Sequence, residues 1–458
     1  MTASSPTDAP PSNLYQSDFP PEEFAARRAR IFEAIGPRAC AVLQGGPPVR
    51  GFEAFRQTNQ FYYGCGIEVP QAYLLLDAST RRTTLYLPHR PEGREAEGAA
   101  LAAEDAEIIE RLAGLDGVFG IEKLAEHLEA ATVLYTPHRP AEGPRGSRDE
   151  LTRADRAVAD DPWDAQPTRE QRFIELLKAR RGELDIRDLS PAIDALRAVK
   201  SPREIALCRQ AGHLSALAVI EAMRSTAPGV LEYQLAAVAN YVYLLHGARG
   251  EGYRPIIAGG ANAWHAHYFR NDCPLKDGDL VLMDAAPDFR YYTSDIGRMW
   301  PVNGSYTPGQ RELYGFMVAY HKALLKRIRP GVTAEEIHAE AAAEMAEVVE
   351  ATSFSNEARQ AAAARTLEFK GHLSHSVGMA VHDVGGYGGR PLVPGVVFAV
   401  DPQMWVPEEK LYIRVEDTVV VTEEGIENLT VAAPLELEDV EVLLRDRSPL
   451  ERPVPPAT

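Results

Sequence analysis

Residues 277–285, which read DGDLVLMDA, have the pattern of a buried β-strand that ends in a carboxylate. Four consecutive apolar residues lead to Asp284, and the chain returns through residues 290–302 with a second carboxylate, Asp295. If the two segments form a hairpin, the carboxylates can lie opposite each other with Cβ atoms ~5 Å apart. Because two carboxylates this close repel each other in apolar surroundings, we expect a bound cation between them.

A second segment repeats this pattern later in the chain. Residues 396–400 are all apolar and lead to Asp401, and residues 411–421 then alternate so that Arg414, Glu416 and Thr418 share one face. Glu416 can be a metal ligand or one half of a structural pair with Arg414. Considered alone, this strand favours the structural pair.

Predicted helices precede both segments, which indicates an internal repeat. Ser201, Thr307 and Thr333 each begin a capping box, with Glu or Gln three residues later. Two similar halves that pack about a pseudo-twofold axis would bring their four carboxylates into one site. Chance similarity of two helix–hairpin units explains the pattern equally well.

Histidines are concentrated near the two segments. They are His265 and His267 before the first, and His372, His375 and His382 before the second. Four carboxylates with an imidazole form an oxygen-rich site that suits Mn(II), Co(II) or Zn(II), and bridging carboxylates hold two such ions ~3.5–4 Å apart. The four cysteines form no CxxC pair, which argues against a thiolate metal site and a disulfide framework.

The length of 458 residues predicts two domains. The first, residues 1–195, alternates strand-like runs with helical stretches such as 22–34, which indicates an α/β layer with a Pro- and charge-rich surface insertion at 137–166. The second spans residues 196–447, and residues 448–458 form a predicted loose tail. The strand-like runs are residues 40–43, 72–76, 83–87 and 132–135.

Charge and hydropathy exclude some classes of partner. The net charge of −18 would repel phosphate backbones and anionic lipids, so we expect neither nucleic acid nor a membrane as a partner. No apolar run approaches the ~18 residues that span a bilayer. The first 24 residues are polar and Pro-rich and lack a signal core, which predicts a cytoplasmic protein.

Several motifs together resemble a known family. DGDLVLMDA at 277–285 with SDIGRMWPVNG at 294–304, LSHSVG at 373–378 with VHDVG at 381–385, and RVEDT at 414–418 with ENLT at 427–430 are similar to the metal-binding segments of aminopeptidase P and prolidase. The likeness covers roughly residues 199–432, in the same order and spacing. FRQTNQFYY at 55–63 resembles the first domain of aminopeptidase P. The implied fold is α/β (α+β), with a C-terminal pita-bread domain that contains a pseudo-twofold repeat, behind a smaller creatinase-like α/β domain.

The resemblance also implies roles for individual residues. His267 and His382 match active-site histidines, and Arg414 matches an arginine on the same wall. Asp401 matches a family residue that serves both as a metal ligand and as the proton shuttle. The implied metal ligands are Asp284, Asp295, His375, Asp401 and Glu416.

Four residues depart from the family pattern. The chain has Asp401-Pro402-Gln403 where the family has Glu-Pro-Gly, and aspartate is one methylene shorter. Gly371 replaces a histidine four residues before His375, and Gly297 stands in place of a threonine.

The implied activity is that of a metal-dependent exopeptidase which hydrolyses the N-terminal peptide bond before proline, through a hydroxide that bridges two divalent ions. Manganese is the expected metal, with cobalt or zinc as alternatives. The expected substrates are small peptides with proline in the second position, and a homodimer or homotetramer is expected. The alternatives are a prolidase-type dipeptidase, an amidase on a non-peptide substrate, and a catalytically weakened binding protein on the same fold.

Overall fold

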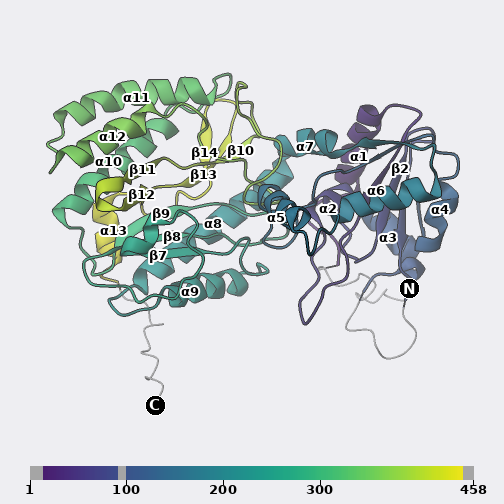
Figure 1. Cartoon of the computed structure of the whole chain (residues 1–458), viewed down its shortest axis with the longest axis horizontal. Helices are drawn as coiled ribbons and strands as arrows, with labels where there is room; N and C mark the ends of the chain where they lie inside the picture. Colours follow the sequence, from purple (N-terminus) through teal and green to yellow (C-terminus); the bar gives the residue numbers. More distant parts are fainter. Residues whose placement is uncertain (1–13, 91–99, 447–458) are drawn as a thin grey trace, which may run out of the picture. The chain divides into compact units, whose positions relative to one another are not determined.

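The computed structural model describes residues 14–90 and 100–446 (Figure 1). The chain forms two compact units, residues 1–197 and 198–458, each with a core of its own. The predicted tail at 448–458 lies outside the described residues. No helix in the described ranges is long and apolar enough to cross a membrane.

The first unit is built on one six-stranded sheet in the order β4-β3-β2-β1-β5-β6. β1, β2 and β3 pair antiparallel, and the remaining pairs are parallel. The four predicted strands are present, whereas β4 and β6 were missed because they are short and carry little apolar alternation. The strands are β1 Cys40–Gln44, β2 Tyr73–Asp77, β3 Arg82–Leu87, β4 Gly117–Gly120, β5 Val133–Thr136 and β6 Asp185–Asp188.

Seven α-helices accompany the described strands of this unit. The segment predicted as a surface insertion contains α5, which is largely exposed, but Glu142 anchors it inside the protein. The Glu142 carboxylate is fully buried between Arg148 and Arg197, each 2.9 Å away. The helices are α1 Pro21–Ile35, α2 Asn59–Cys65, α3 Ala106–Ala113, α4 Leu124–His127, α5 Arg148–Asp160, α6 Arg169–Arg180 and α7 Ser190–Ala198.

The second unit begins with two helices and an antiparallel sheet, β7-β8-β9. The predicted capping box at Ser201 is present: its hydroxyl accepts from the Glu204 amide and the Glu204 side chain accepts from the Ser201 amide. The elements are α8 Pro202–Arg224, α9 Glu232–Leu245, β7 Ile256–Gly259, β8 Leu280–Asp284 and β9 Gly297–Pro301.

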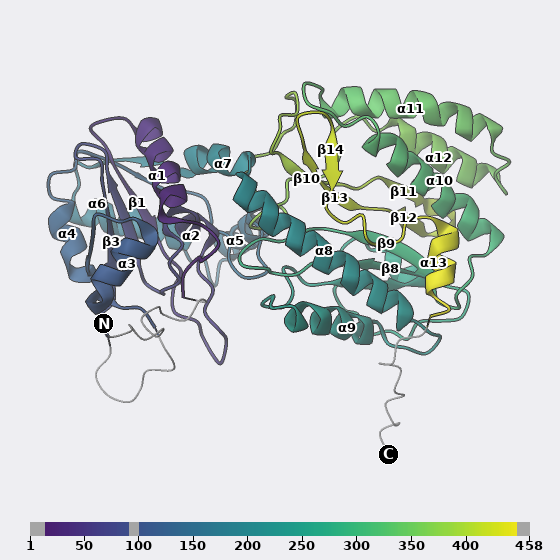
Figure 2. The ribbon, with the colours of Figure 1, turned by 180° about the vertical axis from the view of Figure 1, so that it is seen from behind.

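The second half of this unit has three helices, two small sheets and a closing helix. The predicted capping boxes at Thr307 and Thr333 begin α10 and α11. In Figures 1 and 2 the strands lie between α8 and α9 on one side and α10, α11 and α12 on the other. The elements are α10 Pro308–Leu325, α11 Ala334–Ala351, α12 Glu357–Glu368, β10 Val397–Val400, β11 Gln403–Val406, β12 Leu411–Arg414, β13 Asp417–Val421, β14 Ile426–Asn428 and α13 Leu437–Leu443.

Two details of strand pairing differ from the sequence expectation. Asp284 lies opposite Gly297, not Asp295, because Asp295 precedes β9 in the segment that leads into the strand. The predicted strand at 411–421 is split at 415–416: β12 pairs with β11, whereas β13 pairs with β10 and β14. Glu416 lies at this break and forms a bridge to Gly297, which joins the two halves of the unit.

Candidate metal centre

The five side chains proposed as metal ligands lie at the ends of strands or in the loops beside them. Asp284 ends β8, Asp295 precedes β9, Asp401 follows β10, and Glu416 lies between β12 and β13. His375 comes from the loop between α12 and β10. The carboxylates of Asp284, Asp295, Asp401 and Glu416 are buried, and the His375 ring is partly exposed.

Asp295, His375 and Glu416 form the tightest part of this group, with ligand atoms within 4.8 Å of one another. His375 Nε2 lies 3.2 Å from Asp295 Oδ2 and 3.9 Å from Glu416 Oε1. The other ring nitrogen, Nδ1, donates to the Ser376 carbonyl at 3.3 Å, which leaves Nε2 to face the carboxylates as a ligand atom. Glu416 Oε1 is buried and has no hydrogen-bond partner among the described residues. This donor set fits a divalent cation.

Tyr253 connects Asp284 to this group and was not found from the sequence. Its hydroxyl lies 2.6 Å from Asp284 Oδ1 and 2.5 Å from Asp295 Oδ1. Burial raises the pKa of Tyr253 well above its ordinary value, and the carboxylates of Asp284 and Asp295 raise it further. Tyr253 therefore stays a hydroxyl, which lies between the two carboxylates and can donate its proton to either of them. A tyrosine shortly before a strand carries no sequence pattern that distinguishes it from a core residue.

Arg414 makes contacts to three of the carboxylates. Its Nη1 donates to Asp284 Oδ2 at 2.6 Å, its Nε to Asp401 Oδ1 at 2.8 Å, and its Nη2 to Glu416 Oε2. Burial alone would lower the pKa of Arg414, but the three carboxylates raise it well above its ordinary value. The structural Arg–Glu pair considered as an alternative is therefore present, and it lies inside the carboxylate group.

The pKa values of the carboxylates are shifted in different directions. Burial raises the pKa of Asp284 and of Glu416, and this outweighs the lowering effect of Arg414 on both. Burial also acts to raise the pKa of Asp295, but the hydrogen bond and charge of His375 hold it below its ordinary value. A divalent cation would favour the ionised form of all three groups.

The histidines proposed for catalysis form a row beside the carboxylates. The ring centroids of His375 and His382 are 4.2 Å apart, and those of His382 and His267 are 6.4 Å apart. His267 also stacks on Phe269 at 5.8 Å. The structure thus brings His267 and His382 together with His375. His265 is exposed on the same segment as His267.

A buried ion pair holds the loop that carries His382. Lys200 Nζ lies 3.2 Å from Asp383 Oδ2, and both side chains are almost inaccessible to solvent. A Cβ at Gly378 would come within 2.3 Å of Asp383 Oδ2 and 2.7 Å of Lys200 Cε. Only glycine therefore allows this pair to pack under the loop.

The two halves of the unit also meet through Thr418. Its hydroxyl accepts from the Asp295 amide and donates to the Asp295 carbonyl, both at 2.8 Å. Beside it, a Cβ on Gly297 would lie 3.1 Å from Glu416 Cβ. Glycine at this departure from the family pattern thus fits the close approach of the two strands.

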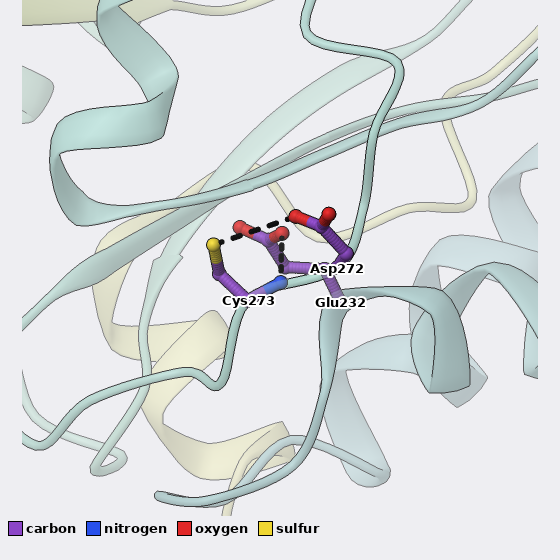
Figure 3. A group of neighbouring side chains, drawn as sticks. All are labelled: Glu232, Asp272 and Cys273. Atoms are coloured by element: carbon purple, nitrogen blue, oxygen red, sulfur yellow. Dashed lines mark hydrogen bonds between the residues drawn. The ribbon is translucent and has the colours of Figure 1, made fainter.

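A second group of possible ligands consists of Glu232, Asp272 and Cys273 (Figure 3). The buried Glu232 carboxylate already accepts four hydrogen bonds, so it has no lone pair directed at a cation. Its role is to hold the segment that carries His267, because the donors lie on both sides of that residue. They are the amides of Gly259 and Cys273, the Asn262 side chain and the Tyr268 hydroxyl.

Comparison with known proteins agrees with this site. Residues 206–423 match the model of metallopeptidase family M24, and residues 24–135 match the N-terminal domain of aminopeptidase P. The Xaa-Pro aminopeptidase of Escherichia coli K12 is 31% identical over 453 residues, which cover 93% of this chain and 98% of the relative.

The chain belongs to metallopeptidase family M24. Solved structures of aminopeptidase P resemble it over nearly the whole chain. E. coli aminopeptidase P with the inhibitor Pro-Leu has a TM-score of 0.77 at 29% identity and covers 94% of this chain and 99% of its own. The zinc-substituted E. coli enzyme in complex with product has a TM-score of 0.78 at 28% identity, covering 94% and 100%. The α/β fold implied by the sequence is confirmed. This M24 chain is a metallopeptidase that uses divalent metal.

Proposed function

We propose that this chain is an exopeptidase that removes the N-terminal residue before proline from small peptides. The observation that carries the proposal is the convergence of four buried carboxylates and one imidazole in a single site. Two relatives that match over almost the whole chain, from Escherichia coli and Haemophilus influenzae, are Xaa-Pro aminopeptidases, which supports the specificity for proline.

The proposed cofactor is a pair of divalent ions held by Asp284, Asp295, His375, Asp401 and Glu416. An oxygen-rich set with one imidazole favours Mn(II), with Co(II) or Zn(II) as alternatives. When bound, the ions would polarise the scissile carbonyl and lower the pKa of a water molecule.

The chain's own residues would orient the peptide and move the proton. Asp401 lies at the edge of the carboxylate group, where Arg414 and Gln403 bind its two oxygens at 2.8 and 2.6 Å. In this position Asp401 can pass a proton to the leaving nitrogen of proline. His267 and His382 lie on the adjoining wall and would donate hydrogen bonds to the carbonyl oxygen as charge develops on it.

The test is hydrolysis of Ala-Pro and Ala-Pro-Leu by protein supplied with Mn(II), Co(II) or Zn(II), with Ala-Ala-Leu as the control for proline specificity. We expect cleavage of the peptides that contain proline and little of the control. Glu416→Gln should abolish cleavage while the protein still folds. Protein that carries measured metal and cleaves neither proline peptide would refute the proposal. A homodimer or homotetramer remains a prediction from the family resemblance, and a cytoplasmic location remains a prediction from the polar first 24 residues.

A further inference from the structure

A cavity of about 410 Å³ lies in the second unit between α12 and β11. This volume falls in the range of ~300–1,000 Å³ that is usual for small-molecule sites. Asp401, Gln403 and Trp405 form one wall, and Arg365 and Phe369 form the other. Because Asp401 would deliver the proton to the leaving nitrogen, the cavity lies on the side of the leaving fragment.

The apolar part of the cavity depends on Gly371, one of the departures from the family pattern. A Cβ on Gly371 would come within 2.9 Å of the Phe369 ring, so a histidine at this position could not coexist with the ring as placed. Phe369 packs edge-on against His338 and His372, with ring centroids 5.4 Å away in each case. With Trp405 on the opposite wall, the ring offers an apolar surface suited to proline.

The polar part of the cavity is dominated by Arg365. It is the only arginine or lysine among the described residues that line the cavity, and it forms no hydrogen bond or ion pair within the described part of the chain. Arg359, on the same helix, is instead bound by Glu409 at 2.7 Å. Arg365 is therefore a cation available to a ligand.

Among the residues that line the cavity, Arg365 supplies the permanent positive charge. Burial lowers the pKa of His338, so this ring is neutral at neutral pH. Its Nε2 donates to the His372 carbonyl at 3.0 Å, and its Nδ1 accepts from Tyr320 at 3.1 Å. Asp401 is already bound by Arg414 and Gln403. A small anion that enters the cavity would meet one unpaired guanidinium, which suits a carboxylate.

We propose that Arg365 binds the C-terminal carboxylate of the leaving fragment, which makes this chain selective for short peptides with a free C-terminus. The inference rests on the proposed function and narrows its substrate class to di- and tripeptides. A blocked or distant C-terminus would leave Arg365 without its partner, so amidated and longer peptides bind less tightly.

The experiment compares Ala-Pro-Leu with its C-terminal amide in the metal-loaded wild type, in Arg365→Met and in Lys370→Met. Lys370 is exposed and does not line the cavity, so its substitution removes the same charge nearby as a matched control. A charge-assisted contact predicts a KM about tenfold lower for the acid than for the amide in the wild type. Arg365→Met should raise the KM of the acid about tenfold and leave the amide unchanged, whereas Lys370→Met should keep the wild-type ratio.

An acid-to-amide KM ratio that survives in Arg365→Met, or one that collapses equally in Lys370→Met, would overturn the inference. Binding of Pro-Leu and Pro-Leu amide, measured by calorimetry, separates this result from failure of the proposed function. If no peptide is cleaved but Pro-Leu still binds more tightly than its amide in an Arg365-dependent way, the carboxylate site stands and the exopeptidase assignment fails. Equal binding of both compounds to the wild type would remove the carboxylate site.

Discussion

Replacing Thr418 with valine would test whether contacts between the two halves of the catalytic unit position a metal ligand. Valine has nearly the shape of threonine but lacks the hydroxyl, so Thr418→Val removes the two 2.8 Å hydrogen bonds to the backbone of Asp295 and the 3.2 Å hydrogen bond donated by the Ser294 hydroxyl. The Asp295 amide is left buried without an acceptor, which costs about 1–3 kcal/mol of unfolding free energy. Loss of such a supporting contact should also weaken metal binding by about 10–100-fold.

Thr226→Val is a closely matched control in the same unit. The buried Thr226 hydroxyl accepts from Trp300 Nε1 at 2.9 Å and donates to the Ala222 carbonyl at 2.8 Å. Its replacement removes this acceptor from the buried Trp300 Nε1 and should cost ~1–3 kcal/mol. The Trp300 side chain donates its hydrogen bond to Thr226 and not to a proposed metal ligand, so Thr226→Val should leave the metal affinity unchanged.

The two effects are measured separately, by urea unfolding of the metal-free proteins and by titration of Mn(II) against a competing chromogenic chelator. We expect both variants to lose stability and only Thr418→Val to lose metal affinity. If Thr418→Val bound Mn(II) as tightly as the wild type, or if Thr226→Val weakened binding equally, Thr418 would be an ordinary core residue rather than a support for Asp295.

Three further predictions concern the same site. Asp401→Ala should lower activity by orders of magnitude because it removes a ligand and the proton relay together. Asp401→Glu should also be poorly active because Arg414 and Gln403 hold the shorter side chain. Robust cleavage by the alanine variant would mean that Asp401 has another role. Removal of metal by a strong chelator should lower the melting temperature, since an ion at 1,000 times its dissociation constant stabilises the fold by about 4 kcal/mol. An unchanged melting temperature in protein shown to be metal-free would count against a tight buried site. Glu232→Gln should lower kcat as well as stability, because the amide side chain cannot accept four hydrogen bonds and the segment that carries His267 is loosened. A kcat equal to that of the wild type would limit Glu232 to a structural role.

The sequence by itself determined several of the elements and the residue types of the site. The capping boxes at Ser201, Thr307 and Thr333 act within four residues of chain, so their helix starts could be read directly and are present in the structure. The apolar runs before Asp284 and Asp401 likewise identified β8 and β10, because burial on both faces demands continuous apolar residues.

The tertiary structure alone decided which of these residues touch. Tyr253 reaches Asp284 and Asp295 across 31 and 42 positions, and Arg414 reaches Asp284 across 130. The register that places Gly297 opposite Asp284, the break at Glu416 and the cavity beside Arg365 depend on the same packing of two halves. Local propensity and periodicity describe the environment of a residue over a few neighbours. Contacts over such separations depend on how whole helices and sheets pack, and no short segment of the sequence contains that information.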